Sequence, residues 1–475
     1  MFIKIKETIK KILSLNQQRG SILMLSLVFG AVASLVIIFG LASYAVFENK
    51  ASIRGQNREM AFHMAEAGVN YYRWHLAHNQ TDFQDGTELS GPYLHEYKDK
   101  DGNIIGYYSL SIKAPLTGST VVVVSSTGWV AWQPETKRTV QVTLGISSLT
   151  NYTFLSNANM SFSNTSVTYG PIHSNGGIRF DGVSDSWVQS AKNKYMYYNA
   201  SSGNYEEHKG VWGGGSPKSF WRYPVPEIDF YAVTADLSEV RNDADDGGIH
   251  LTSSGVEGYH LVFNQDNFNL YQVDTRDCYN GYGRWRNGWS GRYWDGDIYC
   301  YDIKTETFLQ NYSIPANGAI FVEDDVWVEG VVNGRVSLGV GMFPVQEPYH
   351  KIYLNNNLTY NAKASDDVIG LLAQGDIVAP HDTPNNFEIN AAMLSQFGKI
   401  YRPYYDSDIK NSLSIFGSQI SYLGSGWKYS HSLNGSLLSG YDHTTYSYDS
   451  NLRYYPPPNF PIGATYDLIK WEEVK

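Results

Sequence analysis

The sequence predicts an α+β protein in which a long N-terminal transmembrane helix and a small antiparallel sheet precede a large β-solenoid, a β-helix-like domain. Three observations predict this fold class. The stretch from Gly20 to Phe47 carries no charged residue. Residues 104–145 alternate apolar and polar side chains, which is the period of a half-buried strand. Beyond residue 149, short aliphatic runs recur with Gly, Asn and Asp between them, as stacked solenoid rungs require.

The uncharged stretch is long enough to span a bilayer. A helix rises about 1.5 Å per residue, so this segment exceeds the roughly 30 Å of a hydrocarbon core. Before it, five basic residues stand against a single acidic one, Glu7. The positive-inside rule therefore places the N-terminus in the cytoplasm and exports the rest of the chain. We interpret residues 1–20 as a basic leader and residues 21–80 as the helix.

The second half of the predicted helix is amphipathic. No proline occurs between Ala51 and His78, and apolar residues recur there at three- and four-residue steps. The repeating positions are Ala61, Ala65, Val69, Tyr72 and Leu76. An antiparallel sheet is expected over residues 81–148 to cover this stripe, with strands at 104–113, 119–132 and 136–145. Residues 99–103 contain Asp-Gly and predict a hairpin turn rather than a calcium loop.

Residues 149–460 predict the β-solenoid. Ile320, Val326 and Val332 lie six residues apart, which is a solenoid step that a β-sandwich does not demand. The last segment, residues 461–475, alternates like an edge strand after a run of three prolines. We expect it to return to the sheet of residues 81–148, which would make the solenoid an insertion.

Charge and cysteine content limit the classes of function. The formal charge is −11, and without the first twenty residues, which carry +4, it is −15. Such an acidic exterior argues against broad binding of a phosphate backbone. Cys278 and Cys300 are the only cysteines, and both fall in the exported part, where a disulfide persists. We expect them to be bonded, with a stabilisation of about 3 kcal/mol in the chain-entropy description.

The segment between the two cysteines, 278–300, is the most unusual part of the sequence. It interleaves aromatic and basic residues, and rings next to arginines can stack on nucleic-acid bases or on sugar faces. The competing interpretation is that the rings pack on the flank of the solenoid while the arginines stay in water. The candidate ligand-binding residues are Arg284, Trp285, Arg286, Trp289, Arg292 and Trp294.

Signatures of catalysis are nearly absent. The sequence lacks the usual nucleophile and zinc motifs, so we expect no enzyme activity, no cofactor and no metal site. Solenoid enzymes that act on polysaccharides use clustered acids, and the nearest candidates are Asp324–Asp325 and Asp366–Asp367. Both pairs are expected in turns between rungs. The acids of residues 243–246 lack a full calcium ligand set and predict a solvated loop.

The N-terminal part resembles the PilX-type minor pilins of type IV pili and pseudopili. The residues that carry the resemblance are Gln18–Gly20, the uncharged helix from Ser21, Ala61–Gly68, Ser125–Trp129 and Lys137–Val140. The resemblance implies that a prepilin peptidase cuts between Gly20 and Ser21. It also implies that the helix then packs among membrane lipid and other pilin subunits. Major pilins carry a glutamate five residues into the mature helix, where this chain has Leu25, and subunits at a pilus tip can lack that acid.

The C-terminal part resembles a solenoid module that is often fused to such N-termini and mostly has no assigned activity. The matching residues are Gly318–Val322, Val332–Val336, Ile369–Ala373, Gly375–Val378, Tyr448–Asp449 and Pro456–Pro458. Related competence pilins carry a solenoid inserted in the pilin sheet and are implicated in capturing DNA.

These resemblances imply a pilin-like structural subunit in the cytoplasmic membrane or in a pilus on the cell surface. Its exported head would contact surfaces, extracellular DNA or glycan. The alternatives are a membrane-anchored polysaccharide-active enzyme and a plain membrane-anchored surface protein.

Overall fold

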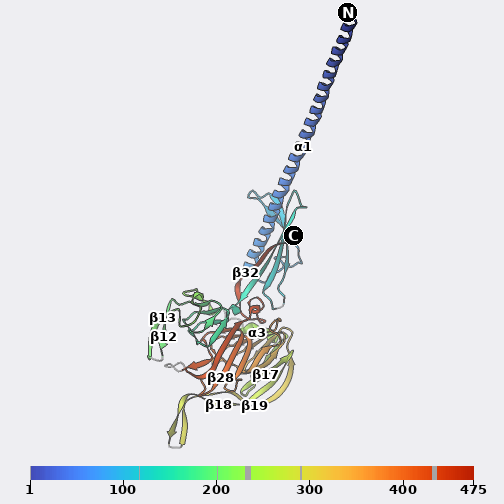
Figure 1. Cartoon of the computed structure of the whole chain (residues 1–475). Helices are drawn as coiled ribbons and strands as arrows, with labels where there is room; N and C mark the ends of the chain where they lie inside the picture. Colours follow the sequence, from blue (N-terminus) through green and yellow to red (C-terminus); the bar gives the residue numbers. More distant parts are fainter. Residues whose placement is uncertain are drawn as a thin grey trace. The chain divides into compact units, whose positions relative to one another are not determined.

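The computed structural model describes residues 2–116, 118–199, 202–230, 237–288, 291–430 and 436–474. Within these ranges, only the backbone is described for residues 2–21, 288, 291 and 464. The chain divides into two compact units (Figure 1). Unit 1 comprises Met1–Lys113, Val123–Thr143 and Ile469–Lys475, and unit 2 comprises Ala114–Val122 and Leu144–Leu468.

Unit 1 begins with one long helix, α1, which spans Phe2–His78. The sequence predicted a helix from about Ser21, but the structure continues it through the leader. That segment is rich in Lys, Ile and Leu and has no glycine or proline before Gly20, so its propensity favours helix. The side chains from Ile22 to Gln56 are all exposed. The part of α1 from Ile22 onward is the candidate membrane span, apolar and long enough to cross a bilayer.

The end of α1 is covered by a sheet, and its predicted apolar stripe is confirmed. The stripe residues are all buried, namely Ala61, Ala65, Val69, Tyr72 and Leu76. The helix approaches the sheet closely at Gly128, where an added Cβ would lie 2.3 Å from the carbonyl oxygen of Ala61. Glycine is therefore required at Gly128 for the close packing of helix and sheet.

The sheet of unit 1 has five strands in the order β1-β2-β3-β4-β32. These are β1 Tyr93–Lys98, β2 Ile104–Lys113, β3 Val121–Val130, β4 Lys137–Ser148 and β32 Ile462–Val474. The predicted strands at 104–113, 119–132 and 136–145 are thus confirmed. The turn between β1 and β2 is a hairpin in which the Asp99 carboxylate accepts from the backbone N–H groups of Asp101 and Asn103, each at 2.9 Å.

The C-terminal strand β32 lies beside β4 in this sheet. The chain therefore leaves the sheet after β4 and returns to it only at residue 462. Arg138 of β4 forms an ion pair with Glu473 of β32, and Phe62 of α1 packs edge-on against Trp471, with ring centroids 6.0 Å apart. Everything between β4 and β32 is an insertion between two neighbouring strands.

Unit 2 consists mainly of short strands. From Phe154 to Arg222 its elements are β5 Phe154–Ser156, β6 Met160–Phe162, β7 Ser166–Tyr169, β8 Ile172–Ser174, β9 Ile178–Phe180, β10 Val183–Ser184, β11 Val188–Ser190, β12 Lys194–Asn199, β13 Asn204–Lys209, β14 Val211–Trp212 and β15 Trp221–Arg222. Next come helix α3 Leu237–Asp245 and strands β16 Ile249–Leu251, β17 Gly258–Gln265, β18 Asn267–Gly288 and β19 Gly291–Ser313. The remaining elements are β20 Ala319–Val322, β21 Val326–Val332, β22 Arg335–Val340, β23 Ile352–Tyr360, β24 Val368–Ala373, β25 Ile377–Val378, β26 Asn386–Ser395, β27 Ile400–Tyr401, β28 Ile409–Ser421, β29 Ser425–Gly426, β30 Lys428–Ser430 and β31 Leu437–Tyr448.

Parallel ladders join strands that alternate in the chain order, so that each strand pairs with the next strand but one. One ladder runs through β20, β22, β24, β26 and β28, and another through β21, β23, β25 and β27. The ladders are in register, so similar side chains stack in columns. Ile320 lies beside Leu338, which lies beside Leu371, and all three are fully buried. These columns form the apolar core of unit 2.

The spatial order of the ladders differs from their order in the sequence. The early strand β5 pairs with the late strand β28, and β8 and β11 then extend the ladder away from it. The chain next crosses to the opposite end of the ladder, where β16 pairs with β20. Helix α3, on this crossing, contacts β16, β20 and β22. The acids expected in a solvated loop at 243–246 therefore begin within a helix.

Candidate ligand-binding surface on the β18–β19 hairpin

Strands β18 and β19 form one long antiparallel hairpin that extends beyond the parallel ladders (Figure 1). Its pairing runs from Asn267 opposite Ser313 to Gly288 opposite Gly291. The first half of β18 also pairs with β17, which in turn joins the parallel ladder through β21. The hairpin thus starts as part of the sheet and ends as a free two-stranded ribbon.

The inner part of the hairpin covers an apolar column on the ladder. Trp327, Tyr353 and Val378 occupy equivalent positions on successive strands, and Val273 of β18 completes a buried cluster with them. The rings of Trp327 and Tyr353 stack with centroids 4.5 Å apart. Tyr301 of β19 packs against this cluster. Aromatic packing on the flank of the ladder therefore describes this half of the hairpin.

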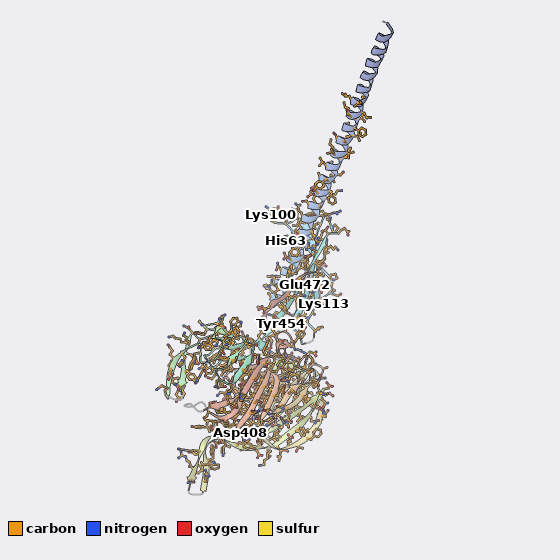
Figure 2. The ribbon with its side chains drawn as sticks, in the orientation of Figure 1. His63, Lys100, Lys113, Asp408, Tyr454 and Glu472 are labelled. Atoms are coloured by element: carbon orange, nitrogen blue, oxygen red, sulfur yellow. A yellow bond between two sulfur atoms is a disulfide. The ribbon has the colours of Figure 1, made fainter. Side chains whose placement is uncertain are left out.

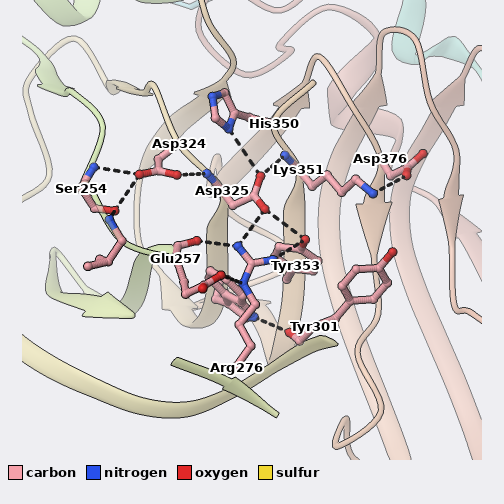
Figure 3. A network of polar contacts seen from close by, with 12 residues as sticks. Ser254, Glu257, Arg276, Tyr301, Asp324, Asp325, His350, Lys351, Tyr353 and Asp376 are labelled. Atoms are coloured by element: carbon pink, nitrogen blue, oxygen red, sulfur yellow. Dashed lines mark hydrogen bonds and ion pairs between the residues drawn. The ribbon is translucent and has the colours of Figure 1, made fainter. Parts of the chain in front are cut away.

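A polar network fixes the same half, and Figure 3 shows it. The Asp325 carboxylate accepts from the Lys351 backbone N–H at 2.9 Å and from the Tyr353 hydroxyl at 3.1 Å. Arg276 of β18 contacts Asp325 at 3.1 Å and Glu257 at 2.8 Å. Burial alone would raise the pKa of Asp325, but the hydrogen bond from His350 and the attraction of Arg276 hold it below its usual value.

Three of the four acids considered for catalysis, Asp324, Asp325 and Asp367, accept hydrogen bonds in the structure, whereas Asp366 is exposed. The Asp324 carboxylate accepts from the backbone N–H and the hydroxyl of Ser254, at 2.8 and 2.7 Å. Asp367 accepts from the backbone N–H groups of Gly334 and Ala362, at 2.7 and 2.9 Å. Within the described part of the chain, no group of three or more His, Cys, Asp or Glu side chains is arranged to hold a metal ion.

A disulfide joins Cys278 to Cys300 at the point where the hairpin leaves the ladder, which confirms the predicted pairing. Beside it, Tyr279 stacks on His381 with centroids 3.7 Å apart and donates to Asp382 at 2.8 Å. The buried Asp302 carboxylate accepts from the backbone N–H groups of His381 and Asp382, at 3.1 and 2.7 Å. The base of the hairpin is therefore held by a covalent bond and by hydrogen bonds to residues 381–382.

The outer ribbon brings most of the predicted ligand-binding residues together. Trp285 and Trp294 face each other across the two strands with ring centroids 5.6 Å apart and planes at 75°. The guanidinium of Arg292 lies 5.0 Å from the centroid of the Trp285 ring. Trp285 is 49% exposed. Trp289 was predicted in the same set and lies outside the described residues.

The opposite side of the ribbon carries charge. Arg286 forms an ion pair with Asp295, and Arg284 lies opposite the same aspartate in the strand pairing. Three arginines and two aspartates, Asp295 and Asp297, lie between the cysteines, which gives a net charge of +1. The ribbon therefore presents paired charges and exposed rings, not a strongly basic patch.

The sequence analysis missed the residues that support the hairpin base. His381, Asp382, Arg402 and Asp408 come from turns of the ladder and meet beside the disulfide. Asp408, labelled in Figure 2, lies where the hairpin leaves the ladder. The spacing of these residues in the sequence does not predict the cluster, because all four are more than eighty residues from Cys300.

The predicted processing site lies within α1. Gly20 and Ser21 are both in the helix, and their side chains are outside the described set. The candidate membrane span begins directly after them.

The chain was compared with protein families, curated proteins and solved structures. No known protein family matches the sequence, and no curated protein matches it. Among solved structures, this chain is similar to the competence-associated pilin ComZ from Thermus thermophilus, at 13% identity and a TM-score of 0.31, covering 88% of this chain and 98% of that chain.

Proposed function

We propose that this protein is a pilin-like structural subunit of a type IV pilus or a related cell-surface assembly. The observation that carries the proposal is the division of α1. Its first half is apolar and uncovered from Ile22 onward, whereas its second half is buried against the antiparallel sheet from Ala61. A helix built in this way can lie in lipid with one half and carry a folded unit on the other.

The same division suggests the partners. Small residues such as Gly30 and Gly40 lie in the uncovered half, where an added Cβ would meet nothing within 4 Å. Such residues allow the helices of other pilin subunits to approach closely, both in the membrane and in an assembled pilus. A prepilin peptidase that cuts between Gly20 and Ser21 would free the helix for this packing. The basic leader favours an N-terminus in the cytoplasm and an exported body.

The exported body is proposed to be a β-solenoid head that contacts surfaces. The in-register parallel ladders support a solenoid. The exposed Trp285 ring with Arg292 beside it, and Arg284 and Arg286 on the other side of the ribbon, support capture of DNA or glycan at the tip of an assembly. The absence of a glutamate at Leu25 supports a position at the tip. The hydrogen bonds that Asp324, Asp325 and Asp367 accept from the protein support a subunit without enzyme activity over a polysaccharide-active enzyme.

N-terminal processing tests the proposal. We expect the mature protein to begin at Ser21 and Gly20→Phe to leave the full chain in the membrane. The matched control is Gly40→Phe, which changes a glycine of the same helix away from the cut and should be processed normally. Intact mass and N-terminal sequencing of the membrane fraction give the answer. A wild-type protein that keeps its full-length mass, and so differs from Gly20→Phe only by the substituted side chain, would establish the plain membrane-anchored protein instead.

A further inference from the structure

A row of tyrosines lies beside the disulfide, on the ladder side of the hairpin base. Tyr282 of β18 contacts Tyr404 with ring centroids 5.7 Å apart, and Tyr404 contacts Tyr429 of β30 at 5.5 Å. The ring planes meet at 76° and 79°. Tyr282 is 72% exposed and Tyr429 is 37% exposed, while Tyr404 is half-buried between them. Three segments that are far apart in the sequence thus supply one exposed aromatic row.

The row is built on rigid elements. The backbone N–H of Asp406 donates to the carbonyl oxygen of Asn280 at 3.1 Å, which ties the loop after Tyr404 to the hairpin. Tyr405, the next residue, is fully buried and packs edge-on against Tyr299 of β19. The backbone that carries the rings is therefore held in place without a bound ligand, so binding would cost little conformational entropy.

The polar groups around the row include an exposed carboxylate. Asp406, two residues after Tyr404, is exposed, and after burial its negative charge is the next cause of the raised pKa of Tyr404. Among the nearby cations, Arg284 of β18 is exposed and has no ion pair within the described residues. Arg402 is fully buried and paired with Asp408, and Lys410 contacts the same aspartate.

The tyrosine rings and the neighbouring carboxylate together favour one chemical class of ligand. Perpendicular rings form a corner in which a pyranose can stack on one ring and touch the edge of the next. An exposed carboxylate accepts hydrogen bonds from hydroxyl or ammonium groups. The same carboxylate repels phosphate and sulfate, and the cations at Arg402 and Lys410 are paired with Asp408. We therefore expect the row to favour a ligand without negative charge, whereas a nucleic acid remains a candidate for the outer ribbon.

We propose that Tyr282, Tyr404 and Tyr429 form a carbohydrate-binding platform, with Asp406 accepting hydrogen bonds from an oligosaccharide that carries no negative charge. The platform is separate from the Trp285–Trp294 ribbon and does not depend on processing at Gly20. Neutral sugars and amino sugars share this chemistry.

The test uses the full chain in detergent and four probes: oligomers of glucose, of N-acetylglucosamine and of glucosamine, and single-stranded oligothymidylate. We expect Tyr404→Ala and Tyr282→Ala to weaken oligosaccharide binding by about tenfold. Tyr404→Phe keeps the ring and should bind as wild type. The matched control is Tyr205→Ala, which removes a tyrosine that is 67% exposed on another hairpin and should change nothing.

Charge distinguishes the two classes of ligand, neutral sugars and amino sugars. If the ligand is an amino sugar, Asp406→Asn should weaken binding of the glucosamine oligomer more than that of the neutral ones, and added salt should weaken it too. If it is a neutral glycan, salt should have no effect. The inference is overturned if no oligosaccharide binds, if Tyr404→Ala and Tyr205→Ala bind alike, or if Tyr404→Ala weakens oligothymidylate binding instead. Because Tyr282 is exposed, its variant tests the platform even where Tyr404→Ala does not fold.

Discussion

At the residue scale, a few charged side chains attach the hairpin to the ladder. Arg276 contacts two carboxylates and also lies 4.7 Å from the centroid of the Trp327 ring. An arginine between a buried aspartate and an aromatic face contributes both charge pairing and apolar contact. Its loss would leave the Asp325 carboxylate without its ion pair to a guanidinium group.

We predict that Arg276→Met destabilises unit 2 by about 2–4 kcal/mol, since breaking a buried ion pair leaves an uncompensated charge. The measurement is the urea midpoint of the full chain in detergent. Arg284→Met is the control, because Arg284 lies on the same strand, is exposed and has no ion pair among the described residues. The double variant Arg276→Met with Asp325→Asn should recover part of the loss. Equal midpoints for the two arginine variants would contradict the role assigned to Arg276.

A buried histidine makes a second prediction at this scale. His260 contacts Glu306 at 2.8 Å and Glu329 at 3.8 Å. Burial alone would lower the pKa of His260, but the two carboxylates raise it above its usual value. The raised pKa means that the folded state binds the proton more tightly than the unfolded state. This stabilisation is complete below the unfolded pKa of about 6.5 and is lost as the pH rises through the folded pKa.

We therefore expect His260→Gln to lower the thermal midpoint more at pH 6 than at pH 9. His443→Gln is the control, because the side chain of His443 is 66% exposed, and its effect should be small at both values. A midpoint difference for His260→Gln that grows with pH would show that the sign is wrong.

At the scale of elements, the β18–β19 hairpin has two halves with different support. The inner half is held by the apolar column and by Arg276. Beyond the contacts of residues 279–282 with residues 381–406, the outer half is held by its own strand pairing, the tryptophan pair and the Arg286–Asp295 ion pair. An isolated two-stranded ribbon is marginally stable in water. The Cys278–Cys300 bond lies at the boundary between the halves, so it limits how far an opening of the ribbon can spread.

We predict that the double variant Cys278→Ser with Cys300→Ser increases amide exchange in residues 279–299 and leaves the parallel ladders protected. The hydrogen bonds from residues 381 and 382 to Asp302 hold the inner half in place without the disulfide. Hydrogen-exchange mass spectrometry of the full chain measures both regions, and β24 provides the internal control. Loss of protection in β24 would mean that the disulfide supports the whole of unit 2.

At the scale of the whole molecule, one chain combines a candidate membrane helix with two compact units. The sheet of unit 1 requires strands from both ends of the sequence, since β4 and β32 are neighbours. Unit 1 is therefore complete only after residues 149–461 have been made. This insertion links completion of the sheet to synthesis of the larger unit.

The orientation of the chain in the membrane gives the last prediction. If the N-terminus stays in the cytoplasm, protease added to intact spheroplasts should digest both units and protect only the first part of α1 and the leader. In the Gly20→Phe variant, which is expected to keep the leader, an epitope tag at residue 1 should survive and a tag after residue 475 should be lost. Cells opened with detergent are the control, where both tags are lost. Survival of the C-terminal tag in intact cells would reverse the proposed orientation.

Much of unit 1 could be predicted from the sequence, because its signals are local. The uncharged stretch before Glu48, the stripe from Ala61 to Leu76 and the alternation of β2 to β4 each lie within one element, and their periods reveal the buried face. The disulfide was also predictable, since Cys278 and Cys300 have no other partner. The ribbon carries an exposed Trp285 and a half-buried Trp294, while the inner half of the hairpin packs its rings on the ladder, and ligand binding by the ribbon stays a prediction.

Only the tertiary structure decided the rest. The pairing of β5 with β28 joins strands more than two hundred and fifty residues apart, and a short apolar run such as Phe154–Ser156 carries no information about which partner it takes. The tyrosine row has the same origin, because Tyr282, Tyr404 and Tyr429 come from three segments. The sequence determined which residues are apolar, aromatic or charged, but register and ladder order depend on packing between distant segments. That packing determines which of these side chains meet at the hairpin base.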